Sequence, residues 1–392
     1  MSSCPFEDLK ARGFIYQNTS EEAIKQLLSE GPVYYYVGFD PTGDSLHVGH
    51  LLPVMAMRHL QLAGHKPIVL VGGATGQIGD PSGKSVARVQ LSKEVVAHNA
   101  ECLKKQLSRF ISPENAVFAN NADWFNDMRY LDFLRDIGSK FSVNKMLTAE
   151  SVKMRLETGL SFLEFSYMLL QAYDFYMLNK KYNCKLEMGG QDQWGNITAG
   201  TELVRRISQQ EVHGFTMPLL MNSSTGQKFG KSVGGAVWLD KNKTSVFDYY
   251  QFWRNTDDAD VRKLMLYFTM LPIDEIDHLC AASINRAKEV LAYEATALAH
   301  SPEEAAKAYL GAGAKFGFAD KENKIPTSSA IGKIQADTAV LDDLPTCNVI
   351  IPEEGIWIVK LLVEAFWRWL PAAACANPTA MRGVWSRAAE PT

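Results

Sequence analysis

Residues 36–50 read YVGFDPTGDSLHVGH and predict a strand, a tight Pro/Gly turn and a helix that opens with His47 and His50. The start of a helix carries unpaired N–H groups and the positive end of a dipole, so it attracts phosphate. Two imidazoles three residues apart lie on one face of such a turn. Gly49 between them leaves space for a flat ligand against the backbone. This combination is typical of a nucleoside triphosphate site.

The elements around this stretch alternate between strand and helix. We expect helix in residues 1–30, strands at 33–39 and 66–71, and helices at 47–63, 92–110, 128–138 and 163–181. The run KPIVLV at 66–71 is apolar throughout its centre, as in a strand buried inside a parallel sheet. Pro53 should cost its helix a hydrogen bond and bend it. The order predicts an open, doubly wound α/β sheet.

The composition changes after about residue 240. Short helices are expected at 247–255, 259–269, 273–281 and 285–298, and linkers at GAGAKFG (311–317) and IPTSS (325–329). We therefore predict a catalytic domain over 1–235, a helical domain over 236–325, and a linker with a partial or disordered C-terminal segment over 326–392.

Charge and cysteine content exclude several function classes. The net charge of -4 over 392 residues excludes nucleic-acid binding by bulk charge, so any such binding requires a local basic patch. None of the six cysteines forms a CxxC pair, which argues against a zinc or redox motif and fits a reducing compartment. No leader and no run of about 18 apolar residues is evident, so we expect a cytoplasmic protein that does not span or bind a membrane. We also expect no bound metal.

Two glycine-rich stretches imitate nucleotide motifs and fail them. GDPSGKS at 79–85 has three residues between its glycines where a P-loop needs four, and Pro81 removes a backbone donor. GGATG at 72–76 lacks the GxGxxG spacing. Neither a P-loop nor a GxGxxG dinucleotide motif is therefore predicted, although the expected sheet is Rossmann-like.

Three further patterns carry possible chemistry. One polar stripe on an otherwise apolar helix consists of Tyr167, Gln171 and Asp174. Such a stripe fits a ligand site and fits an internal polar network between helices equally well. GGQDQWGN at 189–196 is a loop for a small polar ligand or, equally, a helix-capping turn. Lys228 and Lys231 form a cationic segment in a glycine-rich loop that could close over phosphates; a lone pattern of this kind is usually solvated surface.

Together and in this order, the stretches resemble the tyrosyl-tRNA synthetases of the bacterial and organellar type. His47-Val48-Gly49-His50 is similar to the HIGH signature of class I synthetases, and Lys228-Phe229-Gly230-Lys231-Ser232 to the KMSKS signature. GFDPTGDSLHVGH, LVGGATGQIGDPSGKS, EFSYMLLQAYDF and GGQDQWGNITAG carry the rest of the resemblance, which covers residues 1 to about 300.

The resemblance implies roles for single residues. The phenol hydroxyl of a tyrosine substrate would be held by Tyr36 and Asp174, its ammonium by Asp80, Tyr167 and Gln171, and its carboxylate end by Gln193. The nucleotide would lie against Gly38, Asp40, Gly49, Gly190, Asp192 and His50. Catalytic contacts to phosphate would come from Thr42, His47, His50, Lys228 and Lys231, with Lys84 and Arg88 near pyrophosphate. Glu187 and Gln191 depart from the family pattern, which commonly has Gln and Ser there.

The implied reaction is activation of L-tyrosine by ATP with Mg²⁺, followed by transfer to tRNA, in a homodimer. No cofactor would be tightly bound. The dimer surface would map to 120–165, where Trp124, Phe125, Phe133 and Phe141 cluster, although a buried core would show the same aromatics. Lys241, Lys243, Arg254, Arg262 and Lys263 could contact tRNA phosphate or simply be solvated.

Two other functions remain open from the sequence. One is a non-catalytic RNA-binding protein on the same fold, against which His47, His50, Lys228 and Lys231 argue. The other is a tryptophan-specific relative, against which Asp174 opposite Tyr36 argues. Ile356–Phe366 resembles the first helix of the C-terminal RNA-binding domain found in many members, but the Ala/Pro-rich tail after it does not continue that domain.

Overall fold

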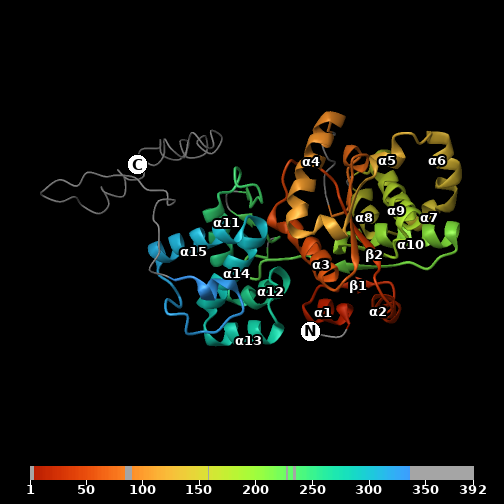
Figure 1. Cartoon of the computed structure of the whole chain (residues 1–392). Helices are drawn as coiled ribbons and strands as arrows, with labels where there is room; N and C mark the ends of the chain where they lie inside the picture. The colour runs from red at the N-terminus through yellow and green to blue at the C-terminus, as the bar shows by residue number, and fades with distance from the viewer. Residues whose placement is uncertain (1–3, 84–90, 158, 227, 233–234, 336–392) are drawn as a thin grey trace, which may run out of the picture. The chain divides into compact units, whose positions relative to one another are not determined.

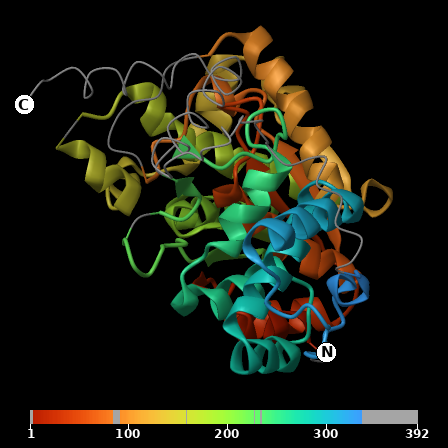
Figure 2. The same cartoon turned by 90° about the vertical axis from the view of Figure 1, so that its left-hand side faces the viewer.

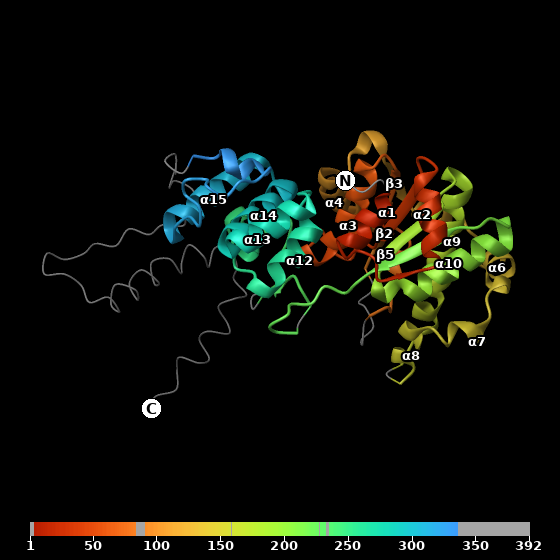
Figure 3. The ribbon, with the colours of Figure 1, turned by 90° about the horizontal axis from the view of Figure 1, so that it is seen from below.

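A six-stranded sheet organises the first part of the chain in this computed structural model, which describes residues 4–83, 91–157, 159–226, 228–232 and 235–335. Its strands lie in the order β1-β6-β5-β2-β3-β4 (Figures 1 and 3). They are β1 (Gln17–Asn18), β2 (Tyr34–Phe39), β3 (Lys66–Val71), β4 (Val117–Asn120), β5 (Leu186–Gly190) and β6 (His213–Met217). All neighbours pair in parallel except β1 with β6. The predicted doubly wound α/β sheet is confirmed.

The order of the strands reverses at β2. From β2 the chain builds outward through β3 and β4, whereas β5 and β6 add to the opposite side of β2. In an open α/β sheet, ligands bind beyond the carboxyl ends of the strands at such a switch point. The switch point here lies between β2 and β5, so residues 38–42 and 188–193 flank it.

Helices cover both faces of the sheet and build two cores. Along β2, Tyr35, Val37 and Phe39 belong to one buried cluster, and Tyr36 belongs to the other. This alternation follows from the two-residue period of a strand. The helices of this part are α1 (Pro5–Ala11), α2 (Glu21–Ser29), α3 (Leu51–Leu62), α4 (Lys93–Phe110), α5 (Ala122–Phe125), α6 (Tyr130–Asp136), α7 (Val143–Met146), α8 (Glu150–Leu156), α9 (Phe162–Tyr182) and α10 (Trp194–Ser208).

Helix α9 brings the predicted polar stripe to the sheet. Ser161 begins it with a capping box, in which the Ser161 hydroxyl accepts from the N–H of Glu164 while the Glu164 carboxylate accepts from the N–H of Ser161. Asn183 ends it in the left-handed conformation (φ 54°). Tyr167 and Asp174 are buried on this helix, so the stripe faces the interior.

Two expectations for the N-terminal part were wrong. Residues 1–30 are not continuously helical, because β1 separates α1 from α2. The α-helix after the histidines begins at Leu51, and a 3₁₀ turn (Val48–His50) precedes it. Pro53 therefore lies in the first turn of α3, where backbone N–H groups need no α-helical partner, and the expected cost to the helix interior does not arise.

Five helices form the second part: α11 (Val246–Arg254), α12 (Asp258–Phe268), α13 (Ile273–Ala282), α14 (Ile284–Ala299) and α15 (Pro302–Phe316). Figure 2 views the chain from their side. The first four match the expected helices within one or two residues. The linker expected at 311–317 was wrong, because 311–316 complete α15. A Cβ on Gly313 would lie 1.9 Å from the Phe318 ring, so this glycine permits close packing.

The rest of the predicted C-terminal segment lies largely outside the described residues. Positions 336–392, including the expected helix at 356–366, fall there. Residues 325–329 are described and form neither helix nor strand, as expected. Within the described part of the chain, no helix is long and apolar enough to span a membrane.

Candidate active site

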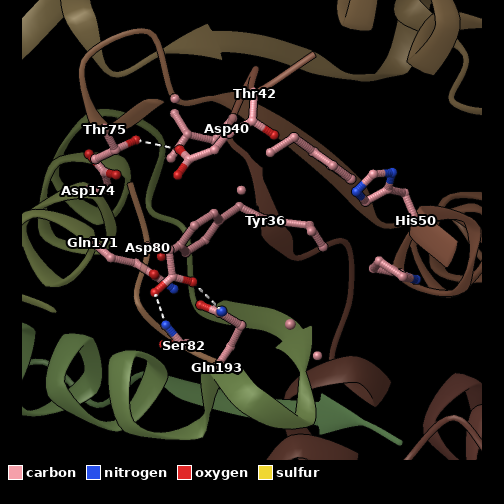
Figure 4. Close-up of a pocket in the computed structure, with 18 of the residues that line it drawn as sticks. Tyr36, Asp40, Thr42, His50, Thr75, Asp80, Ser82, Gln171, Asp174 and Gln193 are labelled. Carbon is pink, nitrogen blue, oxygen red and sulfur yellow. Dashed lines mark hydrogen bonds between the residues drawn. The ribbon is translucent and has the colours of Figure 1, made fainter. Parts of the chain in front are cut away.

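A cavity of about 290 Å³ lies at the switch point of the sheet. Figure 4 shows it with Asp174 and Thr75 toward one end and His50 toward the other. Of the predicted site residues, the following line it: Tyr36, Gly38, Asp40, Thr42, His50, Asp80, Tyr167, Gln171, Asp174, Gly190, Asp192 and Gln193. They come from segments more than 150 residues apart, so the structure brings together what the sequence only suggested.

Asp174 is held at one end of the cavity by two donors. Asn121 Nδ2 donates to its Oδ2 at 3.1 Å, and Trp124 Nε1 donates to its Oδ1 at 2.8 Å. Burial raises the pKa of the Asp174 carboxyl well above its ordinary value, although both hydrogen bonds act in the opposite direction. Each carboxylate oxygen can accept a further bond. This end of the cavity therefore suits a ligand hydroxyl.

Tyr36 lies on β2 beside Asp174. Its side chain is 1 % exposed, and its hydroxyl has no hydrogen-bond partner among the described residues. Burial raises the pKa of this phenol well above its ordinary value, and Glu187 and Asp174 add to the rise. A buried hydroxyl without a partner costs about 1–3 kcal/mol, so a ligand that pairs with it gains that amount.

Two more carboxylates lie in the middle of the cavity, each oriented by neighbours. Asp40 accepts from Thr75 Oγ1 at 2.7 Å and from the Tyr167 hydroxyl at 2.8 Å. Asp80 accepts from the N–H of Ser82 at 2.9 Å and from Gln193 Nε2 at 2.6 Å (Figure 4). Carboxylates grouped in one cavity favour a cationic ligand group such as an ammonium.

Gln171 connects this region to β5. Its Nε2 donates to Glu187 Oε1 at 3.0 Å, and its Oε1 accepts from Asn196 Nδ2 at 3.0 Å. Burial raises the pKa of Glu187 to about 7, against the hydrogen bond from Gln171 that acts to lower it. The Gln171 amide is thus oriented with its oxygen as the acceptor that remains available to an ammonium group.

The two histidines stabilise their own turn. The N–H of Gly49 donates to His47 Nδ1 at 3.1 Å, and the N–H of His47 donates to His50 Nδ1 at 3.2 Å. Their ring centroids lie 3.9 Å apart. An Nδ1 that accepts a hydrogen bond leaves the proton of a neutral imidazole on Nε2. Each ring therefore presents an Nε2–H donor, which suits phosphate oxygen.

Gly49 has a different role from the one expected. A Cβ there would lie 2.8 Å from the His47 ring and 3.5 Å from the carbonyl oxygen of Phe229. The glycine lets the imidazole fold over the backbone, so the ring occupies the space foreseen for a flat ligand. Neither His47 nor Gly49 belongs to the residues that line the cavity.

The lysine segment packs on this histidine turn. A Cβ on Gly230 would lie 2.9 Å from the backbone nitrogen of Gly49. Lys228 is exposed and lines a neighbouring cavity, which shares Asp192 with the first. The backbone of Lys231 forms β7 (Lys231–Ser232) with β8 (Gly235–Ala236), while its side chain, like Lys84 and Arg88, lies outside the described set.

The sequence interpretation missed five polar residues that orient the site: Thr75, Ser82, Asn121, Trp124 and Asn196. A usable signal existed for Asn121, because it follows β4 at the carboxyl end of a parallel strand. Thr75 and Ser82 lie in the two glycine-rich stretches at 72–76 and 79–85, whose glycine spacing gives no signal for these hydroxyls.

The four aromatics proposed for a subunit surface are internal. Trp124 and Phe133 are buried, and Phe125 and Phe141 pack against the same core. Among the proposed tRNA contacts, Lys243 pairs with Asp44, Arg262 with Asp277 at 2.6 Å and Lys263 with Asp260 at 2.6 Å, while Arg254 donates to the Gly317 carbonyl at 2.9 Å. Three of the proposed tRNA contacts, Lys243, Arg262 and Lys263, are therefore engaged in ion pairs within the protein.

Comparisons with known proteins found one family model and several similar chains. The family model for class I tRNA synthetases (W and Y) matches residues 28–315. A tyrosine–tRNA ligase from Clostridium beijerinckii is 54% identical over 350 residues, which cover 88% of this chain and 86% of the relative. One from Clostridium tetani is 52% identical over 360 residues, covering 91% and 88%. A crystal structure of a C-terminally truncated Aspergillus nidulans mitochondrial tyrosyl-tRNA synthetase aligns with a TM-score of 0.72 and 33% identity, covering 80% of this chain and 94% of that one.

Proposed function

The chain belongs to the tyrosyl-tRNA synthetases of class I, and from this premise we propose that it joins L-tyrosine to its tRNA at the expense of ATP. In the first step tyrosine and ATP form tyrosyl-adenylate and pyrophosphate. In the second step the tyrosyl group passes to the 3′-terminal ribose of tRNA. ATP and tyrosine are substrates, with Mg²⁺ accompanying the ATP phosphates.

The observation that carries this proposal is the sequence of groups along one cavity. An unpaired phenol and an oriented carboxylate, Tyr36 and Asp174, stand at one end. Asp80 and Gln171 follow, and the histidine turn lies at the other end (Figure 4). A ligand with a hydroxyl, then an ammonium, then phosphates matches this order, and tyrosyl-adenylate is such a ligand.

Each part of tyrosine meets a suitable group in this arrangement. The phenol hydroxyl donates to Asp174 and accepts from Tyr36. The ammonium donates to Asp80, to the hydroxyl oxygen of Tyr167 and to Gln171 Oε1. Gln193, which already donates to Asp80, lies toward the carboxylate. Phenylalanine would leave the Tyr36 hydroxyl unpaired, at about 1–3 kcal/mol, and would deprive Asp174 of the phenol donor.

The activation step needs no catalytic base. The tyrosine carboxylate is already a nucleophile; its oxygen forms a bond to the α-phosphorus, and the bond from that phosphorus to the bridging oxygen of pyrophosphate breaks. Catalysis is then positioning and stabilisation of charge on the β- and γ-phosphates. Donors for these phosphates are Thr42, His47, His50, Lys84, Arg88, Lys228 and Lys231.

The nucleotide of the adenylate lies against glycine backbone, where no side chain obstructs it. At Gly38 a Cβ would meet no heavy atom within 4 Å, so the surface above β2 is open to a ribose or base. Asp40, Gly190, Asp192 and His50, which line the same cavity, complete this side. In the second step a terminal ribose hydroxyl of tRNA attacks the carbonyl carbon of the adenylate, and AMP leaves.

We assign residues 1–235 to catalysis, 236–325 to the tRNA anticodon region, and 326–392 to a linker and partial C-terminal RNA-binding segment. We further propose a cytoplasmic homodimer. Its contact surface, here called the dimer face, consists of exposed apolar side chains on α6–α9: Tyr130, Leu131, Leu134, Val143, Leu147, Met154, Leu156 and Phe162. Exposed apolar side chains concentrated in one segment of the chain support an interaction surface there.

The proposal is tested by tyrosine-dependent exchange of labelled pyrophosphate into ATP, with tryptophan and phenylalanine as controls, followed by charging of tRNA. Exchange with tyrosine alone is expected. Exchange with tryptophan would identify an indole-specific relative. Binding of tRNA without exchange would identify a non-catalytic RNA-binding protein and overturn the proposal.

A further inference from the structure

Two buried polar atoms without a partner meet at the Tyr36 end of the cavity. They are the Tyr36 hydroxyl and Glu187 Oε2, neither of which has a hydrogen bond among the described residues. Tyr36 and Glu187 are register partners on the parallel strands β2 and β5, so their side chains project from the same face of the sheet. Both line the cavity. Tyr36 thus stands between the proposed substrate hydroxyl and a second carboxyl group.

One oxygen of Glu187 is fixed as an acceptor. Gln171 Nε2 donates to Oε1 at 3.0 Å, and Asn196 Nδ2 fixes the orientation of the Gln171 amide from the other side at 3.0 Å. Oε2 is therefore the atom that carries the proton when Glu187 is neutral. A Cβ on Gly200 would lie only 3.1 Å from Oε2, so helix α10 closes this side against water.

The groups that face Glu187 are neutral or acidic. They are Tyr36 on β2, Gln171 and Asp174 on α9, and Cys184 just before β5, while α10 approaches with Gly200. Its register partner on β6 is Gly214. Burial accordingly raises the pKa of Glu187 to about 7, so neutral and ionised forms both exist near neutral pH.

We propose that Glu187 is a positioning residue for tyrosine recognition and acts through Tyr36. Neutral Glu187 donates its Oε2 proton to the Tyr36 oxygen, and Tyr36 then donates its own proton to the substrate phenol. Ionised Glu187 instead accepts the Tyr36 proton, so Tyr36 presents only lone pairs to the substrate. The inference rests on the proposed function, because the ligand is L-tyrosine.

The direction of the pH effect follows from the donors. The substrate phenol has one proton, which goes to Asp174, so its oxygen needs a donor that Tyr36 supplies only when Glu187 is neutral. Tyrosine should thus bind the neutral form better and take up as much as one proton when it binds above the pKa of Glu187. Loss of one hydrogen bond weakens binding by about two- to tenfold.

The test is calorimetric titration of the full chain with L-tyrosine from pH 6 to 8.5, in buffers of different ionisation enthalpy. We expect the dissociation constant to rise about two- to tenfold over this range, with proton uptake at the higher pH. In Glu187→Gln the amide donates permanently, so affinity should not change with pH. In Tyr36→Phe the relay is absent, so affinity should be weaker and equally independent of pH.

Each alternative result has a definite meaning. The inference is overturned if the wild-type affinity is independent of pH, or if Glu187→Gln keeps the wild-type profile, because Asp174 is present in both proteins. Circular dichroism checks that both variants fold; if either does not, the profile of the other decides. Absence of tyrosine binding at every pH would overturn the proposed function and this inference together, whereas binding with equal profiles overturns the inference alone.

Discussion

The indole Nε1–H of Trp124 donates a 2.8 Å hydrogen bond to Oδ1 of Asp174. Asn121 donates to the other oxygen at 3.1 Å. The carboxylate is 3 % exposed, and hydrogen bonds of this kind favour its charged form against the burial that disfavours it. The position and charge of Asp174 therefore depend on Trp124 in α5 and on Asn121 just before this helix. The sequence assigned neither residue to the site.

Replacing Trp124 with Phe keeps an aromatic ring and removes this donor. A hydrogen bond to a charged group is worth about 1.5–3 kcal/mol, so the KM for tyrosine in pyrophosphate exchange should rise about tenfold or more, while the KM for ATP changes little. Trp194→Phe is the matched control, because Trp194 lines the neighbouring cavity. A W124F enzyme with unchanged tyrosine KM would show that Asp174 needs no such support.

A substitution at Gly38 tests the nucleotide contact without disturbing the fold. An added Cβ meets no protein atom within 4 Å, so Gly38→Ala should keep the thermal midpoint. The methyl group occupies space assigned to ATP, and displacement of a reactant is costly, so the KM for ATP should rise about tenfold with tyrosine affinity unchanged. Gly195→Ala, where the new Cβ has an ordinary contact of 3.4 Å, should leave the KM for ATP alone. Equal ATP kinetics in both variants would place the nucleotide elsewhere.

His47 has a structural and a catalytic role that two substitutions can distinguish. Its Nδ1 accepts from the N–H of Gly49, and asparagine can replace this capping contact. His47→Asn should therefore keep the thermal midpoint yet lower kcat for exchange about 100-fold, since the Nε2–H donor to phosphate is lost. His47→Ala should lose the cap as well, at about 1 kcal/mol of stability. Full activity in H47N would remove His47 from catalysis.

The sequence predicted the residues that meet in the cavity better than it predicted the contacts that hold them in place. The motif segments carry their own turn and capping signals, so the sequence predicted β2, β3, α9 and twelve of the residues that line the cavity. Asn121 and Trp124 reach Asp174 across about fifty residues, a contact that no local period reports. In the sequence Gly313 indicates a loop, whereas in the structure it lies in α15 and allows Phe318 to approach this helix. The two residues of β1 are too few to show a period of two.

Glu187 also makes stability depend on pH. Its pKa is about 7 in the folded chain against an ordinary 4.5, so its contribution to stability is fully present below pH 4.5 and is lost as pH rises through 7. The loss amounts to about 3 kcal/mol. Denaturant unfolding of the ligand-free chain at pH 5 and pH 8 should show Glu187→Gln gaining about that much on the wild type. A constant difference would place an ionised Glu187 in the folded chain at both values.

The dimer face gives the last prediction. Leu131 is 75 % exposed on α6 and belongs to the proposed dimer face, where several apolar side chains are exposed together. A carboxylate there costs the folded monomer little but opposes burial between two chains. Leu131→Asp should therefore convert a dimer to a monomer in light scattering coupled to size-exclusion chromatography, at an unchanged thermal midpoint measured at low concentration.

A second leucine provides the comparison that separates a dimer face from exposure in general. Leu62 is 65 % exposed at the end of α3, outside the segment from α6 to α9. Because no dimer contact is assigned to it, Leu62→Asp should remain dimeric at the same concentrations, whereas Leu131→Asp and Phe162→Asp should both dissociate. A wild-type monomer at micromolar concentration, or an L131D protein that stays dimeric, would contradict the assignment, and dissociation of L62D alone would move the contact surface to α3.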